Sequence, residues 1–322
     1  MKLSSLLVKQ QIASDLKKVE AQLDHVLHTG SEDFNALIRP LSAAGGKRLR
    51  ASLFLLIARA GQSEEKERIQ IATAIEMLHL ATLIHDDVLD QAELRRGVPA
   101  IHCSKGNKVA ILSGDYLFAK AFDIVADVGS VACLKVFSYV ISSLVEGEFL
   151  QMEDVFSLHQ GVDRYLSKTQ KKTADFIEGC MELGGIIGHW DTDKVTYLKQ
   201  YGHALGMAFQ VTDDIMDYRE STETTGKPVG KDVKEGILTY PLLSIVSDDT
   251  EAYLEDELQA IKEGKDTKTL LAYVRGQGGL TNTLALEASY REQAVNALDA
   301  LPDFAGKAYL YDSIDSLAQR KV

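Results

Sequence analysis

Apolar side chains recur every three or four positions along most of this chain, a spacing typical of helices that bury one face or all faces. Twelve stretches show it, at residues 5–28, 47–60, 65–92, 107–126, 129–156, 162–186, 194–220, 238–247, 250–263, 267–276, 279–300 and 304–320. Strand-like alternation is almost absent, and glycines and small polar residues mark the breaks. The pattern predicts an all-α protein: one domain over residues 1–322, a bundle of roughly ten or more helices.

Composition narrows the class of protein. The 322 residues are 45% hydrophobic and carry a net charge of -12, which argues against a non-specific nucleic-acid binder. Cys103, Cys133 and Cys180 are too few and too scattered for a disulfide framework or a zinc site, which favours a reducing compartment. No apolar run approaches the roughly 18 residues that a membrane span needs, and Lys9 and Gln10 interrupt the first run too early for a secretion signal. We therefore expect a cytoplasmic protein.

Two long apolar stretches end in the same pattern, Asp-Asp-x-x-Asp. The first acidic cluster is Asp86, Asp87 and Asp90, and the second acidic cluster is Asp213, Asp214 and Asp217. On a helix, residues i and i+4 share a face, so the first and last aspartates of each cluster present paired carboxylates. Such pairs repel one another unless a cation bridges them.

Oxygen ligands suit hard divalent ions, and Mg²⁺ in proteins is usually held by a few carboxylates together with waters and substrate phosphates. The alternative is that each cluster is a solvated acidic helix end, but the repeated spacing favours a metal site. A calcium-binding EF-hand would need alternating acidic residues and a central glycine, which are missing here. The two clusters together predict a site that holds a diphosphate through Mg²⁺.

Basic residues that could grip a diphosphate directly occur in three groups, at residues 45–50, 95–97 and 171–173. In the first group, Lys47 and Arg50 follow paired glycines at an expected helix start, where backbone N–H groups favour an anion. Lys47 and Arg50 are three positions apart, and so share a helix face that could bind a second diphosphate. His79 lies seven residues before Asp86, nearly on the stripe of the first acidic cluster, and can point into the same cavity. The alternatives are solvated basic faces and a structural histidine.

These residues together resemble the trans-isoprenyl diphosphate synthase family, in its medium- and long-chain type, over nearly the whole chain. The similar segments are Gly45-Gly46-Lys47-Arg48-Leu49-Arg50, Asp86-Asp87-Val88-Leu89-Asp90 with Arg95-Arg96-Gly97, Gly114-Asp115-Tyr116-Leu117, Gly147-Glu148 with Gln151, Lys172-Thr173, and Phe209-Gln210 with Asp213-Asp214-Ile215-Met216-Asp217. The resemblance implies the isoprenoid synthase fold, a helical bundle around a central cavity, and a homodimer or a heteromer with a small subunit. The short apolar runs indicate no transmembrane segment, although a hydrophobic product could bring the enzyme to a membrane surface.

The resemblance also implies roles for individual residues. Isopentenyl diphosphate is expected on Lys47, Arg50, His79 and Arg96, and the allylic diphosphate on Arg95, Lys172 and Lys227. Mg²⁺ is expected on Asp86, Asp90 and Asp213 directly and on Asp87, Asp214 and Asp217 through waters. One position departs from the family: Ile237 follows Glu235-Gly236 where many relatives have lysine, and Lys231 or Lys234 is the candidate substitute.

The expected reaction begins when the allylic C–O bond ionises, with positive charge stabilising the departing diphosphate. The double bond of isopentenyl diphosphate then attacks the cation. Oxygen dipoles of Thr173 and Gln210 are expected to stabilise that cation without trapping it. The proton lost in the last step of the condensation is expected to go to the departed diphosphate. Each cycle lengthens the chain by one isoprene unit.

Product length is expected to depend on the helix that leads to the first acidic cluster. One turn before Asp86 lie Ala81 and Thr82, which are small, and Leu78 lies one turn earlier. No aromatic ring would close the pocket there, so we expect a product longer than four isoprene units, in the range of six to ten.

Two other functions compete with this one. A class I terpene cyclase also ionises an allylic diphosphate, but its second metal motif mixes Asn, Ser and Glu, and it needs no second diphosphate site. A non-catalytic prenyl-binding subunit of a heteromeric synthase would gain nothing from two intact acidic clusters. A prenyltransferase is therefore favoured.

Overall fold

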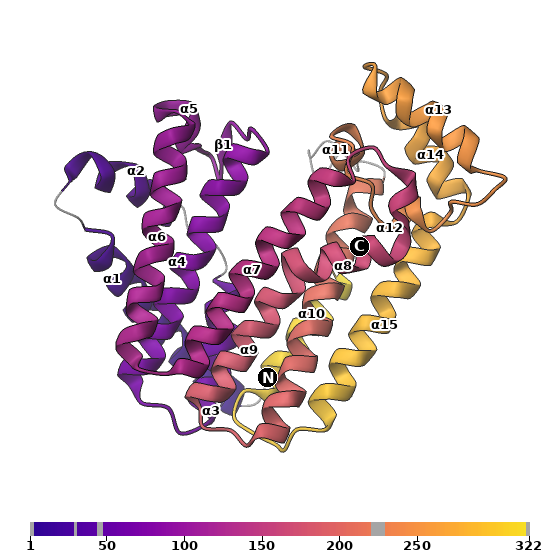
Figure 1. Ribbon diagram of the computed structural model, residues 1–322. Coiled ribbons are helices and arrows are strands. Elements are labelled where there is room, and N and C mark those ends of the chain that lie inside the picture. Colours follow the sequence, from indigo (N-terminus) through magenta and orange to yellow (C-terminus); the bar gives the residue numbers. More distant parts are fainter. Residues whose placement is uncertain (1–2, 29–30, 44–47, 220–228, 320–322) are drawn as a thin grey trace. The chain divides into compact units, whose positions relative to one another are not determined.

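The computed structural model describes residues 3–28, 31–43, 48–219 and 229–319, and these are almost entirely helical (Figure 1). Across these ranges the only β-structure is a short antiparallel hairpin of β1 (Leu94–Arg95) and β2 (Val98–Pro99). The all-α prediction is confirmed. Among the helices described, none combines the length and apolar composition that crossing a membrane requires.

The chain divides into two compact units, each assembled from several segments. The first unit contains residues 1–138, 180–196 and 303–308, and the second contains residues 139–179, 197–302 and 309–322. The division does not test the sequence-based interpretation of one domain, which stays a prediction.

The first unit is built around α4 (Glu65–Leu89), which packs against α1 (Leu3–Val26), α3 (Leu49–Ala60) and α6 (Asn107–Val128). Two further helices are α2 (Glu32–Ala43) and α5 (Ile101–Lys105). Residues 51–58 of α3 are all buried, since this helix is apolar around most of its circumference. The sequence analysis missed α2, although Phe34, Ile38 and Leu41 follow helical spacing, with Pro40 inside the helix.

Four helices contain residues of both units: α7 (Val131–Glu153), α9 (Asp175–Ile187), α10 (Thr192–Tyr218) and α16 (Lys307–Gln319). The remaining elements of the second unit are η1 (Leu158–Gln160), α8 (Gly161–Thr169), η2 (Gln170–Ala174), α11 (Lys231–Lys234), α12 (Tyr240–Leu243), α13 (Glu251–Lys262), α14 (Lys268–Gly276) and α15 (Gly279–Asp299). Its core joins Tyr165 and Tyr218 to the leucines of α12, α13 and α14. This core fixes α8 and the end of α10, which carry candidate site residues.

The stretch predicted as one helix over 162–186 is interrupted in its middle. Between α8 and α9, η2 is a turn of π-helix that carries Lys172 and Thr173. Turns of this kind inside α-helices frequently occur at functional sites. A β-carbon added to Gly206 would lie 2.5 Å from Cα of Ala174. The missing side chain of Gly206 therefore lets α10 approach η2 closely.

Candidate active site

The first acidic cluster lies where α4 ends. Asp86 is half-buried and Asp90, the C-cap residue, is exposed, with its backbone N–H donating to the carbonyl of Asp86 over 2.8 Å. Both carboxylates therefore stand on the last turn of a 25-residue helix. The carboxyl end of a helix carries partial negative charge, so acidic residues are unfavourable there unless a cation is near. The arrangement suits a divalent cation.

The middle aspartate of this cluster has a different partner. Asp87 is only 3% exposed, and its Oδ1 accepts a hydrogen bond from Nε of Arg95 over 2.7 Å and a second from Nη2 of the same guanidinium. Arg95 stands on β1, and the hairpin turns through Arg96 and Gly97, both with positive φ. Asp87 thus anchors the hairpin to α4. The sequence analysis expected Asp87 to act through waters and Arg95 to contact a diphosphate; the structure pairs them with each other.

A basic cluster of the first unit surrounds His79 with the charges of Arg50, Arg96, Arg48 and Arg95. Burial, followed by the charges of Arg50, Arg96 and Arg48, holds the pKa of His79 well below its usual value. His79 is therefore a neutral hydrogen-bonding group near neutral pH. Burial likewise lowers the pKa of Arg50, although an arginine keeps its charge under ordinary conditions.

The sequence analysis missed Glu76, the acidic residue beside this basic cluster. Glu76 is 3% exposed and pairs with Arg48 over 2.8 Å. Arg48 precedes α3 with a positive φ of 45° and also donates to the carbonyl of Ser42. The sequence signal for Glu76 was a charged residue three positions before His79, inside a largely apolar stretch of the helix. Lys47, like Gly45 and Gly46, lies outside the described residues.

The second acidic cluster lies where α10 ends. Asp213 and Asp217 are half-buried. The carboxylate of Asp217 accepts backbone N–H groups of Lys231 over 3.1 Å and of Asp232 over 3.2 Å, from α11. Burial raises the pKa of Asp217, and burial and the charge of Asp217 raise that of Asp232 to about 6. Because one N–H reaches each oxygen of Asp217, lone pairs remain on both for further partners.

Asp214 faces the interior of the second unit. It is 1% exposed, and its two oxygens accept hydrogen bonds from the Tyr165 hydroxyl over 2.5 Å and from Gln210 Nε2 over 3.0 Å. Gln210 Oε1 in turn accepts a hydrogen bond from the hydroxyl of Thr173 over 2.9 Å. Burial raises the pKa of Asp214 to about 7, against the lowering effect of its two hydrogen bonds. Thr173 and Gln210, both expected to stabilise the cation, are thus hydrogen-bonded to each other, and their role stays a prediction.

The two lysines of the π-helical turn, Lys171 and Lys172, pair with different residues. Lys172 is half-buried and contacts Glu148 over 2.6 Å and Gln151 over 3.0 Å, both on α7. Lys171 pairs with Glu146 instead. A β-carbon on Gly147 would lie 2.7 Å from Cγ of Lys172, so this glycine provides the room that Lys172 occupies. Lys227 lies outside the described residues.

The three residues expected to influence product length differ in exposure. Leu78 is 1% exposed and Ala81 is fully buried, whereas Thr82 is half-buried and donates to the carbonyl of His79 over 2.8 Å. The structure thus places Ala81 inside the packed part of the first unit. Its influence on product length stays a prediction.

Ile237, which stands where many relatives have lysine, takes part in a backbone turn. The backbone N–H of Ile237 donates to the carbonyl of Asp232 over 2.8 Å, which closes the turn after α11. Lys231 carries a side chain that pairs with Glu235 over 3.6 Å. A role for Lys231 or Lys234 in place of the family lysine stays a prediction.

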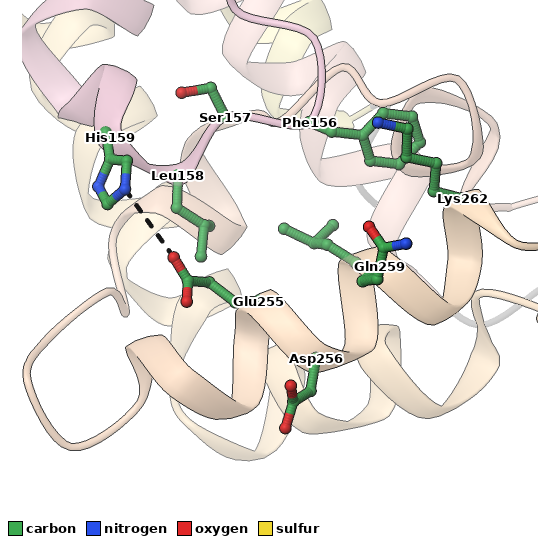
Figure 2. A pocket seen from close by; sticks show the side chains of 9 residues that line it. Phe156, Ser157, Leu158, His159, Glu255, Asp256, Gln259 and Lys262 are labelled. Carbon is green, nitrogen blue, oxygen red and sulfur yellow. Dashed lines mark ion pairs between the residues drawn. The ribbon is translucent and has the colours of Figure 1, made fainter.

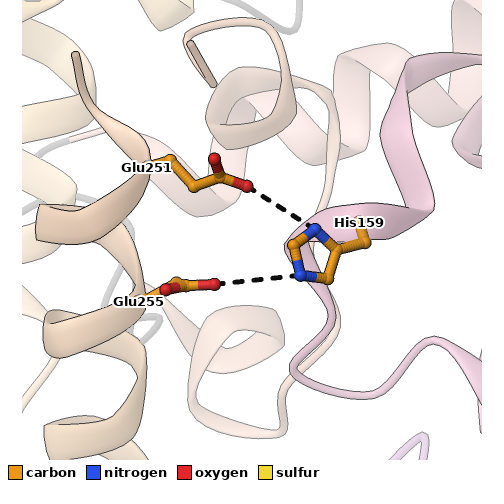
Figure 3. A group of neighbouring side chains, drawn as sticks. All are labelled: His159, Glu251 and Glu255. Atoms are coloured by element: carbon orange, nitrogen blue, oxygen red, sulfur yellow. Dashed lines mark ion pairs between the residues drawn. The ribbon is translucent and has the colours of Figure 1, made fainter. Parts of the chain in front are cut away.

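Elsewhere in the second unit lies a groove of about 470 Å³ between residues 156–159 and α13. Figure 2 shows His159 and Glu255 on one side of it and Phe156 and Lys262 on the other. The imidazole of His159 lies 3.5 Å from Glu251 and 3.9 Å from Glu255 (Figure 3). His159 is largely exposed, and ion pairs this exposed contribute little to stability. The sequence analysis did not predict this groove.

The predicted site residues fall into two sets, one in each unit. Asp86, Asp90, Arg95, Arg96, Arg50 and His79 belong to the first unit, and Lys172, Thr173, Gln210, Asp213 and Asp217 to the second. Within the second set, a hydrogen bond links Thr173 with Gln210, which are far apart in sequence. That both sets act on one pair of substrates stays a prediction.

The chain is similar to known proteins over most of its length. The family model described as Polyprenyl synthetase matches residues 31–274. The chain is 33% identical over 304 residues to heptaprenyl diphosphate synthase component 2 of Geobacillus stearothermophilus, covering 94% of both chains. It is 32% identical to octaprenyl diphosphate synthase of Escherichia coli, covering 92% of this chain and 93% of that protein. The crystal structure of a decaprenyl diphosphate synthase from Rhodobacter capsulatus superposes with a TM-score of 0.91 at 31% identity, covering 98% of each chain.

Proposed function

Because this chain belongs to the polyprenyl synthetase family, we propose that it is a trans-prenyltransferase that lengthens an allylic diphosphate by successive additions of isopentenyl diphosphate. The product is a polyprenyl diphosphate longer than four isoprene units. The similarity to heptaprenyl and octaprenyl diphosphate synthases over more than nine-tenths of the chain supports this product class.

The observation that carries the chemistry is the repeated pair of carboxylates at the end of a long helix. Asp86 with Asp90, and Asp213 with Asp217, each stand one turn apart where the helix end is itself negative. Oxygen ligands of this kind fit Mg²⁺. Asp86, Asp90 and Asp213 would hold it directly. Asp217, whose oxygens already accept backbone N–H groups, would hold it through waters.

When bound, Mg²⁺ supplies positive charge that stabilises a departing diphosphate. The side chains of this protein do the rest. Lys172, with Arg95 and Lys227, binds the allylic diphosphate; Arg50, His79 and Arg96, with Lys47, bind isopentenyl diphosphate. As the allylic C–O bond breaks, its electron pair leaves with the diphosphate oxygen. The oxygens of Thr173 and Gln210 then stabilise the allylic cation through their dipoles, without forming a bond to its carbon.

The test is direct. The purified protein is incubated with farnesyl diphosphate, labelled isopentenyl diphosphate and Mg²⁺, with a chelator in a parallel sample, and the products are sized by chromatography. Labelled chains longer than C20 that form only without chelator are expected. Cyclic, unlabelled products would favour a terpene cyclase, and absence of any product would favour a binding subunit.

Arg50→Ala is expected to raise the KM for isopentenyl diphosphate by roughly ten-fold to a hundred-fold, because a charge-assisted hydrogen bond contributes about 1.5–3 kcal/mol. The KM for the allylic diphosphate should change little. Initial rates with each substrate varied in turn give both constants. The matched control is Arg59→Ala, which removes another arginine of α3 that pairs with Asp15. An effect of Arg50→Ala mainly on the allylic substrate would reverse the assignment of the two sites.

We also propose that the protein is a homodimer. Val145, Phe149 and Met152 lie at helical spacing on α7 and are 50–61% exposed, forming an apolar face of the kind that usually needs a partner. Phe149→Glu is expected to convert the dimer to a monomer in light scattering, because it places a charge in the contact. Leu284→Glu, at an exposed apolar position of α15, is the control. An active monomeric wild-type protein would contradict the proposal, and activity only after a second polypeptide is added would indicate a heteromer.

A further inference from the structure

A partly buried series of hydrogen bonds in the second unit connects three separate elements. Tyr165 of α8 donates to Asp214 of α10, Gln210 one turn earlier on α10 also donates to Asp214, and Thr173 of η2 donates to Gln210. Tyr165 and Asp214 are each only 1% exposed. Buried polar groups with all partners in place hold a single arrangement firmly, since breaking any link leaves a desolvated group unpaired.

These hydrogen bonds determine the orientation of the Gln210 side-chain amide. An amide has a donor end and an acceptor end of similar shape, so its orientation depends on its neighbours. In its ionised form Asp214 offers only oxygen acceptors, which places Nε2 of Gln210 toward Asp214 at 3.0 Å. Oε1 then faces Thr173. The reversed amide would put two acceptor oxygens against each other at that distance.

Tyr165 fixes the carboxylate itself. Its hydroxyl donates a hydrogen bond to Oδ2 of Asp214, so that Oδ1 faces Gln210. The ring of Tyr165 is part of the hydrophobic core of the second unit and lies 5.8 Å from the ring of Tyr240. Its position is therefore determined by core packing rather than by the site, as expected of a residue that supports others.

We propose that Tyr165 is a positioning residue which, through Asp214, holds the carbonyl oxygen of Gln210 beside the hydroxyl of Thr173, where the two oxygens stabilise the allylic cation. Asp214 accordingly serves this chain of contacts rather than the metal ions, unlike the sequence-based expectation that it acts through metal-bound waters. The inference rests on the proposed function for its kinetic consequence, but the hydrogen-bonded chain can be tested without turnover.

The kinetic experiment compares Tyr165→Phe, Gln210→Ala and the double variant in the full-length enzyme. Removing only the hydroxyl is expected to lower kcat by about ten-fold, since small misplacements of catalytic groups are costly. The KM values and the Mg²⁺ concentration for half-maximal rate should stay within two-fold. In the Gln210→Ala background the same change should have no further effect, because coupled residues are not additive. Tyr218→Phe is the control: Tyr218 is fully buried in the same core, and among the described contacts its hydroxyl makes no hydrogen bond to Asp214 or Gln210.

The second readout is the side-chain amide of Gln210 by NMR, identified by its loss in Gln210→Ala. Slow exchange of these protons with solvent in wild type, and faster exchange in Tyr165→Phe but not in Tyr218→Phe, is expected. Equal loss of kcat from Tyr165→Phe with and without Gln210, or a raised Mg²⁺ requirement, overturns the inference; so does an unchanged amide signal. If wild type makes no prenyl product while the amide signals behave as expected, the proposed function fails and the positioning of Gln210 stands.

Discussion

Replacing Asp86 or Asp213 with alanine is expected to lower product formation by about three orders of magnitude, because loss of a charge-stabilising group from an active site commonly costs a factor of 10² to 10³. Each substitution removes a proposed direct ligand of Mg²⁺. The folded structure should tolerate both changes, since both aspartates are half-buried in the last turn of a helix. Removing negative charge at that end should leave the melting temperature unchanged or slightly higher.

The measurements are turnover at saturating substrates, a thermal melt and calorimetric titration with Mg²⁺. Asp127→Ala is the matched control, because Asp127 is an exposed aspartate in the last turn of another helix, α6. It should change neither turnover nor metal binding. Near-normal activity of a folded Asp86→Ala protein would refute the assignment of this cluster to the metal.

Ala81→Phe is expected to shorten the product to three or four isoprene units. Ala81 lies just over one turn before Asp86 on α4, and a helical turn spans about 5.4 Å, roughly one isoprene unit. A phenyl ring there should stop a growing chain after a few additions. Since Ala81 is fully buried, the ring should also cost about 1–3 kcal/mol of stability through overpacking.

A control separates the two effects. Ala72 is also fully buried on α4, nine residues earlier and so half a rotation around the helix from Ala81. Ala72→Phe should lower the melting temperature similarly and leave the product lengths unchanged. Chromatography of products beside thermal melts distinguishes the variants. A stable, active Ala81→Phe enzyme with the wild-type product distribution would place the end of the chain-length pocket elsewhere.

The sequence by itself determined the class of fold and the paired carboxylates, because both depend on local geometry. Helical spacing of apolar residues marks helices wherever they occur, and an i, i+4 pair such as Asp86 with Asp90 shares a face in any helix. The exceptions were α2, where Pro40 lies within a short helix, and the still shorter α5 and α11. Likewise, the π-helical turn in residues 170–174 leaves the apolar spacing almost unchanged, so it could not be read from the pattern.

Only the tertiary structure decided which polar groups meet. Asp86, Asp87 and Asp90 look alike in the sequence, yet Asp87 is turned inward and occupied by Arg95 of the hairpin. Asp214 differs from Asp213 in the same way, since its partner Tyr165 lies 49 residues away. Hydrogen bonds of this kind depend on how helices rotate and approach one another, including the close approach that Gly206 permits. Packing of distant segments sets those quantities, and no local pattern records them.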